Sequence, residues 1–437
     1  MRAVPPVRGD EVSRSSRIIV VGAGIAGLSC GIALHRLGFE VLVLDKVREL
    51  RDAGSGMSVI GHSLVLLEAL GVNIEELGLR QVNVSLRSFD DRCLFQVPLD
   101  ADPALVRRYG SVQYNVHRGE LQQALLRAAL ATGVQVLTGS RVVGFREGPT
   151  DVEVLLESGA TYHGALLVGA DGTNSVVRRT LLPQHQARYS GFSCWRGITE
   201  TPPASATRHG DRMLKTIVHR PGDDVSFTAG FAPRNRCFWV LDVRYPANTL
   251  MPGRDGKRYV LERMTNLSSE FKDIVQATPD ENVLQTDIYD SDPFDWHRGG
   301  RVVLIGDAAH PVVHHFGQGA CLAVEDAVRL ARSLHEAHPD VAMSGERRPV
   351  LSLATVRQAL GSYASLGARA RAWSLVYISR WCGDAYMHNM PWLNWGLQLC
   401  LVFPFNLVFI VVMKVLLFWA QRDLRTFAEA HLTAKRT

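Results

Sequence analysis

The stretch that most constrains this chain is the alternation of apolar and glycine-rich segments between residues 17 and 45. Residues 17–21 form a short run rich in β-branched side chains, typical of a strand buried on both faces. Residues 22–27 follow with G-x-G-x-x-G spacing, apolar side chains then recur at helical spacing, and a second apolar run covers residues 40–44. The pattern predicts a strand, a tight turn, a helix and a second strand, an arrangement typical of dinucleotide-binding sites. A glycine-rich turn without a ligand is the alternative.

Each glycine of this turn meets a physical requirement. Gly22 permits the tight turn, Gly24 lets the backbone approach a pyrophosphate, and Gly27 lets the helix pack close to the sheet. The free N–H groups and positive dipole at the helix N-terminus favour phosphate. Asp45 ends the second strand, where a carboxylate would accept hydrogen bonds from a ribose. The predicted cofactor contacts of this unit are Gly22, Gly24, Ala26, Gly27, Asp45 and Lys46.

Composition narrows the class of protein. The chain has 437 residues, of which 46% are hydrophobic and 21% charged, as expected for a globular protein with a sizeable core. The net charge of +5 is slight for this length and no basic block occurs, so nucleic acid is not an expected partner. The seven cysteines are scattered and form no C-x-x-C, which predicts a reducing, cytoplasmic compartment. Residues 1–16 lack an apolar segment and are expected to form a disordered leader.

Two further strand-to-loop junctions carry acidic residues. A buried strand over residues 165–169 leads into Asp171, and another over residues 301–305 leads into Asp307. Alone, the Asp-Gly pair at the first junction would predict only a turn. Asp307 could hydrogen-bond a polyol, and the Gly317–Gly319 turn would bring a helix N-terminus against a ring, where its dipole could stabilise negative charge.

Two more segments are candidates for cofactor contact. The loop over residues 51–57 is punctuated by glycine and could approach the cofactor again, with Arg51 and Gly56 as the contacts. Arg118 stands at the start of a predicted helix, where a cation is a poor match for the helix dipole. Arg118 is therefore either a surface charge or, as we favour, a ligand for phosphate.

The three motifs, in this order and spacing, resemble those of the single-component FAD-dependent aromatic hydroxylases, the fold group of p-hydroxybenzoate hydroxylase. The motifs are Gly22-x-Gly24-x-x-Gly27, then Gly169-Ala170-Asp171-Gly172, then Gly306-Asp307-Ala308-Ala309-His310-Pro311 with Gly317-Gln318-Gly319. Within that group, the Ser193-Cys194-Trp195-Arg196-Gly197 strand and the helix from Gly319 to Ala327 resemble the salicylate hydroxylase, urate hydroxylase and zeaxanthin epoxidase branch. The resemblance covers about residues 17–335.

The resemblance implies the cofactor and the roles of the candidate residues. FAD would lie where the residues predict a dinucleotide, with its adenosine ribose at Asp45. Arg118 and Asp307 would contact its ribityl and phosphate part, and Asp171 would belong to a segment shared with the approach of NAD(P)H. The residues that would border the isoalloxazine ring are Gly317, Gly319 and Ala320. The chain has no second G-x-G-x-x-G, which fits transient binding of the nicotinamide.

The implied reaction is reduction of FAD by NADH or NADPH, capture of O₂, and oxygen transfer from a flavin C4a-hydroperoxide to a small-molecule substrate. The protein has to hold the flavin against the substrate and exclude water. Aromatic residues between Tyr189 and Arg244 predict a sheet that is either ordinary core or, on one half-covered face, a wall of the substrate pocket.

The chain departs from the family after Pro311. His314 and His315 stand where relatives generally have proline and often asparagine, at the front of the flavin. A histidine pair could relay protons near neutral pH, or it could lie in a solvated surface loop. Arg196 either orients an anionic substrate or pairs at a strand edge. Pro311, His314, His315 and Arg196 are the candidate catalytic residues, and adjacent histidines without a third ligand predict no metal site.

The C-terminal part is unlike that of the soluble relatives. No Asp, Glu, Lys or Arg occurs between Asp384 and Lys414, and residues 397–420 are largely Leu, Val, Phe and Ile. A buried pair of core helices is one interpretation. We favour a monotopic anchor or short hairpin, because Pro404 and Lys414 interrupt any single spanning helix. The prediction is membrane contact through residues 385–420 and, with it, a lipophilic substrate.

The sequence thus predicts an α/β fold with a Rossmann-like FAD-binding domain, an inserted mixed β-sheet substrate domain and a helical, apolar C-terminal extension. The expected boundaries are 17–185 and 291–380 for the FAD-binding domain, 186–290 for the substrate domain and 381–437 for the extension. The expected function is a membrane-associated, NAD(P)H-dependent FAD monooxygenase that hydroxylates or epoxidises an aromatic or isoprenoid-type compound. The alternatives are a soluble aromatic-acid or purine hydroxylase and a flavin-binding protein without oxygenase activity. The sequence predicts no oligomeric state.

Overall fold

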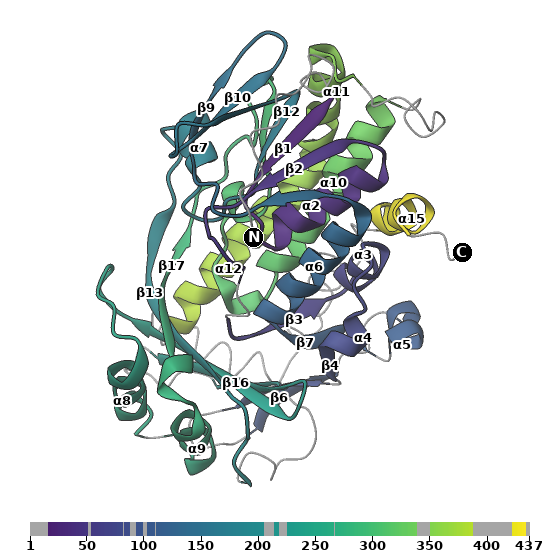
Figure 1. The fold of residues 1–437 in the computed structure, drawn as a ribbon. Coiled ribbons are helices and arrows are strands. Elements are labelled where there is room, and N and C mark those ends of the chain that lie inside the picture. Colours follow the sequence, from purple (N-terminus) through teal and green to yellow (C-terminus); the bar gives the residue numbers. More distant parts are fainter. Residues whose placement is uncertain are drawn as a thin grey trace.

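The computed structural model describes residues 16–50, 54–81, 83–87, 93–98, 103–109, 111–204, 214–217, 225–265, 267–338, 350–387 and 422–433. One part is built on a five-stranded sheet in which every neighbouring pair is parallel (Figure 1). In sheet order its strands are β18 (Val302–Leu304), β12 (Leu166–Gly169), β1 (Arg17–Val21), β2 (Glu40–Leu44) and β8 (Gln135–Leu137). The first strand of the chain therefore lies at the centre of the sheet.

The unit predicted for residues 17–45 is confirmed. All five residues of β1 are buried, which explains its run of β-branched side chains. Helix α2 (Ile25–Arg36) returns the chain to β2 through Gly38, whose φ of +90° suits glycine at a helix end. Helix α2 packs between α6 (Arg118–Thr132) and α10 (Gly319–Ala337), and the three helices cover one face of the sheet (Figure 1).

Two small antiparallel sheets flank this core. One is a meander of β9 (Val142–Glu147), β10 (Val152–Leu156) and β11 (Thr161–Gly164), which leads into β12. The other contains β3 (Gly56–Ile60), β7 (Gln113–His117) and β4 (Gly78–Gln81). The short helices around them are α3 (Ser63–Ala69), α4 (Ile74–Leu77), α5 (Pro103–Tyr109) and α7 (Val176–Leu181).

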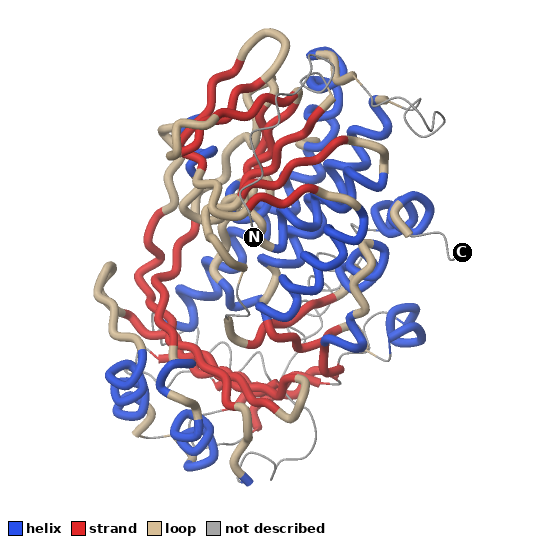
Figure 2. Tube along the Cα trace, viewed as in Figure 1, coloured by secondary structure: helices blue, strands red, loops and turns tan. Residues whose placement is uncertain are grey.

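A seven-stranded, mostly antiparallel sheet forms the second large layer (Figure 2). In sheet order its strands are β17 (Leu284–Asp290), β13 (Arg188–Thr199), β16 (Arg236–Arg244), β15 (Val225–Ala232), β14 (Leu214–Ile217), β5 (Asn83–Arg87) and β6 (Cys93–Pro98). The sequence assigns residues 83–98 to the FAD-binding part, but β5 pairs in parallel with β14 and so extends this other sheet. Chain order alone does not show which sheet completes the hydrogen bonds of an edge strand.

Alternate residues of β13 and β16 face opposite sides of the seven-stranded sheet. Trp195 and Trp239 are fully buried on the far face, where α8 (Gly253–Arg263) and α9 (Ser269–Ala277) cover them (Figure 1). The cross-strand partners Cys194 and Asp242 lie on the near face, which is turned toward the part of the molecule built on the parallel sheet. A short 3-10 helix, η2 (Asp280–Asn282), precedes β17.

Two helices after α10 tie the large layers together. Helix α11 (Leu353–Tyr363) packs on α10, and α12 (Leu366–Met387) follows it. Arg371 of α12 makes a buried bidentate ion pair with Glu325 of α10, both hydrogen bonds being 2.8 Å long. Arg380, further along α12, donates to the buried carboxylate of Asp290 at the end of β17 at 2.6 Å. Helix α12 thus bonds to one layer near its start and to the other near its end.

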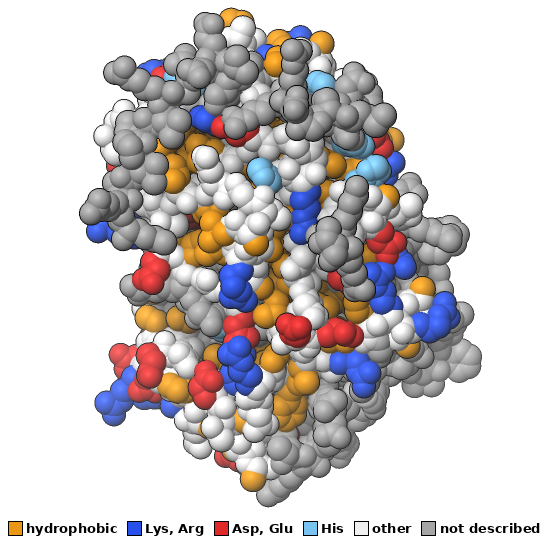
Figure 3. All heavy atoms as spheres, turned by 45° about the vertical axis from the view of Figure 1, so that its right-hand side comes forward, with side chains coloured by type: hydrophobic (Ala, Val, Ile, Leu, Met, Phe, Trp, Pro, Cys, Tyr) orange, Lys and Arg blue, Asp and Glu red, His pale blue; other side chains and the backbone are white. Residues whose placement is uncertain are grey.

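The last described helix, α15 (Arg422–His431), packs against α3 and α10. Arg36 at the end of α2 donates to the carbonyl oxygens of Ala69 and Leu432, which holds the end of α15 to the core. On the face shown in Figure 3, basic and acidic side chains of the described residues are interspersed.

The predicted membrane contact, residues 385–420, lies outside the described residues except for the last three residues of α12. Within the described ranges no helix combines the length and the apolar character that crossing a bilayer requires.

Candidate functional site

The glycine-rich turn between β1 and α2 has the geometry that its sequence predicts. Gly22 has φ +106°, and a Cβ atom there would lie 2.4 Å from the carbonyl oxygen of Ala170. A Cβ at Gly27 would lie 1.8 Å from the carbonyl oxygen of Gly22, so only glycine lets α2 approach the turn. No atom lies within 4 Å of the Cβ position of Gly24. Gly22 and Gly27 are therefore required by packing, whereas Gly24 borders open space.

The N-terminus of α2 is open beside this turn. Gly24 is its N-cap, and no side chain caps the free N–H groups of the first turn. Gln122 of α6 donates to the carbonyl oxygen of Ala23 at 2.7 Å and so braces the turn from the far side. Free amide donors at a fixed glycine turn form an anion-binding surface.

Asp45 also braces the turn. One carboxylate oxygen accepts from the Ala23 N–H at 2.6 Å and the other from the Val47 N–H at 2.9 Å. Each oxygen keeps a second lone pair for a ribose hydroxyl. The neighbouring Lys46 is exposed, and Ala26 is buried close to Gly306, whose Cβ position lies 3.0 Å from the Ala26 methyl group.

Arg118 and Asp307 carry opposite charges and lie close enough to influence each other electrostatically. Both side chains are exposed, and neither has a hydrogen-bond partner among the described residues. Surrounding protein nevertheless desolvates both: burial lowers the pKa of the Arg118 guanidinium although Asp307 opposes the shift, and burial raises the pKa of the Asp307 carboxyl against His310, Arg118 and Arg178. Charged side chains without a hydrogen-bond partner are groups that a polar ligand would satisfy.

Arg178 of α7 holds the Asp307 segment in place. Its guanidinium donates to the carbonyl oxygens of Asp307 at 3.1 Å and Ala308 at 3.0 Å, and to that of Thr173. Asp171, predicted as a cofactor contact, accepts from the Val176 N–H at 2.6 Å and caps α7. The segment that begins at Asp171 therefore holds the segment that carries Asp307 in place.

A buried acid on α10 also holds the loop that carries Asp307. Asp326 of α10 accepts from the Gly306 N–H at 2.8 Å and bonds His310 Nε2 at 2.6 Å. Burial alone would lower the pKa of His310, but Asp326 raises it above its usual value. Both side chains are almost fully buried, so this pair holds the 3-10 helix η3 (Gly306–Ala308) onto α10.

The N-terminus of α10 lies beside Asp307. Gly317 adopts φ +62° at the end of the 3-10 helix η4 (His314–Phe316), and α10 begins at Gly319 without a side-chain cap. The Cβ position of Gly319 is 3.8 Å from Asp307 Oδ1. Pro311 is buried and Ala320 half-buried around this turn. The site therefore has two uncapped helix N-termini, at α2 and α10.

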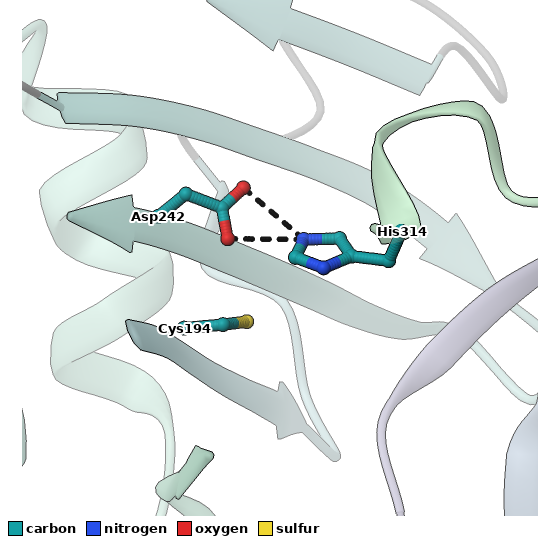
Figure 4. A group of neighbouring side chains, drawn as sticks. All are labelled: Cys194, Asp242 and His314. Atoms are coloured by element: carbon teal, nitrogen blue, oxygen red, sulfur yellow. Dashed lines mark hydrogen bonds and ion pairs between the residues drawn. The ribbon is translucent and has the colours of Figure 1, made fainter. Parts of the chain in front are cut away.

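His314 meets the near face of the seven-stranded sheet at Asp242 (Figure 4), and His315 lies close to the same carboxylate. His314 Nε2 lies 3.0 Å and 3.1 Å from the two Asp242 oxygens, and His315 Nδ1 lies 3.6 Å from one of them. The predicted histidine pair is therefore anchored by a carboxylate rather than dispersed in a surface loop. Donor atoms of Cys194, Asp242 and His314 lie within 4.8 Å of one another, a mixed set that could also hold a divalent metal ion.

Three other predicted residues have different outcomes. Arg196 of β13 is half-buried, donates to the Thr286 hydroxyl and contributes to lowering the pKa of Arg118, which puts the two cations within electrostatic range of each other. A Cβ at Gly56 would lie 2.1 Å from the Phe238 ring, so packing between sheets explains this glycine. Arg51 lies outside the described residues.

Sequence reasoning missed Gln122, Arg178, Asp242 and Asp326 as parts of the site. Arg178 follows Asp171 by seven positions, and its position after an Asp-Gly turn was the available signal. Asp242 reaches His314 across 72 residues, and no local pattern marks it. Long-range partners of this kind are visible only once the strands are placed.

An open glycine turn on a parallel sheet, with unpartnered charges beside a second helix N-terminus, defines a dinucleotide-binding α/β protein. The chain belongs to the FAD binding domain family of FAD-dependent monooxygenases, whose model matches residues 15–345. It is 30% identical over 319 residues to the aurachin C monooxygenase/isomerase of Stigmatella aurantiaca, an alignment covering 72% of this chain and 80% of that protein. The resemblance to FAD-dependent hydroxylases is confirmed.

Longer relatives and solved structures agree with this assignment. The chain is 30% identical over 350 residues to the chloroplastic zeaxanthin epoxidase of Oryza sativa subsp. japonica, covering 78% of this chain and 52% of that protein. It thus spans about half the length of the zeaxanthin epoxidases that it matches. A variant of HpxO from Klebsiella pneumoniae complexed with FAD superposes with a TM-score of 0.75 at 26% identity, over 94% of this chain and 99% of that one.

Proposed function

We propose that this protein uses NADH or NADPH and O₂ to add one oxygen atom to an aromatic or isoprenoid-type small molecule. The observation that carries the proposal is the oppositely charged pair Arg118 and Asp307, neither of whose side chains has a hydrogen-bond partner among the described residues, with Asp307 beside the uncapped start of α10. Membership of the FAD-dependent monooxygenase family supports the reaction type. The names of the relatives, zeaxanthin epoxidase and aurachin C monooxygenase/isomerase, support oxygenation of a small molecule.

The residues present fit FAD. The open space at Gly24 and the uncapped start of α2 suit the pyrophosphate, and Asp45 suits the adenosine ribose. Arg118 and Asp307 suit the phosphate and ribityl part, where each would gain the partner that it lacks within the described chain. Gly317–Gly319 would let the isoalloxazine ring approach the start of α10, whose positive dipole favours negative charge there.

The bound flavin would supply the redox chemistry that amino-acid side chains lack. The chain's own residues would position the substrate and exclude water. We assign that role to the near face of the seven-stranded sheet, where Arg196 and Asp242 lie, together with η4, which carries His314 and His315. On this proposal residues 17–185 without β5 and β6, together with 291–380, form the cofactor part, and residues 186–290 with β5 and β6 form the substrate part.

A second candidate is hydroxylation of an aromatic acid or purine. The observation that favours it is the positive charge of Arg196 on the near face of the seven-stranded sheet, where an anionic substrate could pair with it. A flavin-binding protein without oxygenase activity is the third candidate, and it predicts bound FAD without any substrate-accelerated oxidation of NAD(P)H.

Aerobic oxidation of NADH and NADPH by the FAD-loaded protein tests these candidates. Two panels would be compared, one of water-soluble aromatic acids and purines and one of lipophilic polyprenoids and quinone-like aromatics. Acceleration with one ¹⁸O atom from ¹⁸O₂ in the product supports the proposal, and the responding panel identifies the substrate class. A protein that retains FAD but incorporates no ¹⁸O with either panel would contradict it.

A further inference from the structure

Three side chains with metal-binding atoms meet on the near face of the seven-stranded sheet (Figure 4). Cys194 on β13 is the cross-strand partner of Asp242 on β16, so both side chains leave the sheet on one face at the same level. His314 reaches them from η4. The sequence alone predicts no metal site, because these three residues are distant in the chain and only the folded sheet brings them together.

The donor atoms are close enough to share one ion. Cys194 Sγ, a carboxylate oxygen of Asp242 and a ring nitrogen of His314 all lie within 4.8 Å of one another. Around a tetrahedral zinc ion, whose bonds to nitrogen, oxygen and sulfur are about 2.0–2.3 Å long, neighbouring donor atoms lie about 3.3–3.6 Å apart. Small side-chain rotations would therefore bring the three donors onto one ion.

The strand pair makes this arrangement rigid. Two of the three donors stand on hydrogen-bonded neighbouring strands, so the fold sets their separation and not a loop. Both of these side chains are buried, whereas the His314 side chain is 38% exposed. An ion could therefore enter past the imidazole, and the two strand residues would hold it from the closed side.

One oxygen atom of the buried carboxylate is left without a hydrogen bond. His314 Nε2 bonds Asp242 Oδ2 at 3.1 Å. Oδ1 lies 3.0 Å from the same nitrogen, but it accepts no hydrogen bond of regular geometry from the described residues. A single N–H cannot satisfy both oxygens well, and a buried carboxylate oxygen without a donor is costly. A bound cation would supply the missing partner.

We propose that Cys194, Asp242 and His314 form a binding site for a divalent transition-metal ion, and that Zn²⁺ suits these donors best. Thiolate, imidazole and carboxylate are the ligands that zinc takes in proteins, whereas Mg²⁺ and Ca²⁺ take oxygen ligands. Binding would release to solvent the thiol proton and the proton that His314 shares with Asp242. The site goes beyond the proposed function and does not depend on it.

Three protein ligands leave a fourth position of a tetrahedral ion free for water or another small ligand. His315 is close to this site without completing it, since its Nδ1 lies 3.6 Å from an Asp242 oxygen. On this proposal His315 supports the carboxylate and is not itself a ligand.

Metal binding to the FAD-loaded protein, after treatment with a chelator and its removal, tests the site directly. We expect equilibrium dialysis to give one Zn²⁺ per chain, which excess Mg²⁺ does not displace. Co²⁺ should give the visible bands of a four-coordinate ion and a thiolate-to-cobalt charge-transfer band in difference spectra against the FAD-loaded protein. Adding Zn²⁺ should remove these bands.

Two buried cysteines on the same strand pair provide a matched comparison. Cys194 faces the near side, whereas Cys237 of β16 belongs to the hydrophobic core on the far face. Cys194→Ala should abolish the charge-transfer band and weaken Zn²⁺ binding by about a hundredfold or more, and Cys237→Ala should change neither. His314→Gln should weaken Zn²⁺ binding in the same direction. Circular dichroism and retained FAD show that each variant is folded.

Several results would overturn the proposal. Failure of the wild-type protein to bind Zn²⁺ in a one-to-one ratio is the first, and it depends on no variant. Bound Co²⁺ without a thiolate band is the second, and unchanged Zn²⁺ affinity in Cys194→Ala is the third, since either would place the ion elsewhere on the protein. Displacement of Zn²⁺ by Mg²⁺ would indicate a site made of oxygen ligands alone and would contradict the proposal as well.

Discussion

The guanidinium of Arg178 donates to the main-chain carbonyl oxygens of Asp307 and Ala308, at 3.1 Å and 3.0 Å, from the helix that Asp171 caps. Two motifs that lie more than a hundred residues apart in the chain are therefore one hydrogen-bonded structure. This relationship explains why the Asp-Gly motif and the Gly-Asp motif occur together. The first orients the backbone on which Asp307 stands.

Arg178→Met should weaken both folding and FAD binding. The substitution keeps most of the side-chain volume but leaves three carbonyl oxygens without a donor, which we expect to cost about 2–4 kcal/mol of unfolding free energy. Urea unfolding and FAD titration would measure the two effects. Arg179→Met is the matched control, because Arg179 is exposed and, among the described residues, its side chain bonds only the nearby carbonyl of Asn174. The unfolding free energy of this variant should change by less than about 0.5 kcal/mol.

The glycines of the first turn should separate folding from cofactor binding. Gly22→Ala places a Cβ 2.4 Å from a carbonyl oxygen at a positive φ, so we expect little folded protein. Gly24→Ala adds a methyl group in open space and should leave the apoprotein folded while weakening FAD binding about tenfold or more. Far-ultraviolet circular dichroism of the apoproteins and FAD titration distinguish the two. Unchanged FAD affinity in Gly24→Ala would contradict the assignment of the pyrophosphate.

The stabilising effect of the Asp242–His314 pair should depend on pH in a defined direction. The pKa of His314 is raised to about 10, so the stabilisation from its protonation is fully present below its usual pKa of 6.5 and is lost as pH rises through about 10. The difference in unfolding free energy between wild type and Asp242→Asn should therefore be constant from pH 5 to 6.5 and shrink toward pH 10. Denaturant titrations across this range measure it. A difference that grows with rising pH would show that the pair does not bind a proton on folding.

We expect that apolar residues can replace both members of the buried ion pair between Arg371 and Glu325, but that replacing either member alone destabilises the protein. Either Arg371→Met or Glu325→Leu leaves a buried charge without its partner, and we expect each to cost about 3–5 kcal/mol of unfolding free energy. The double variant restores a neutral interior and should recover most of that loss. A double-mutant cycle from urea unfolding gives the coupling energy. Additive losses would mean that α12 does not depend on this contact.

The features that could be predicted from the sequence are those whose determining residues lie close together along the chain. The strand–turn–helix–strand unit at residues 17–45 was predictable because every determinant is local: β-branched residues, fixed glycine spacing and helical periodicity. Asp307 and Gly317–Gly319 were predictable as strand-end and helix-start positions for the same reason. Membership of the family was visible because three such local motifs occur in a fixed order.

Contacts between distant segments could not be predicted in this way. The partner of His314 is Asp242, on a strand 72 residues away in the chain, where a polar residue would be read as an ordinary surface position. Gly56 is required by the Phe238 ring, a packing constraint from another sheet. The attachment of β5 and β6 to the seven-stranded sheet likewise depends on edge pairing that no periodicity reveals.

Because side chains alternate along β13 and β16, the residues that pack the core and the residues that could contact a ligand lie on opposite faces of the sheet. Trp195 and Trp239 lie in the hydrophobic core on the far face of the sheet. Their neighbours on the near face are Cys194, Arg196 and Asp242. Changes at every second position could therefore retune ligand preference while the intervening positions keep the protein stable. Proteins that share this sheet can therefore change the residues of one face, and with them the ligand, at little cost in stability. A one-residue shift in strand register would exchange the two faces and so disrupt both functions at once.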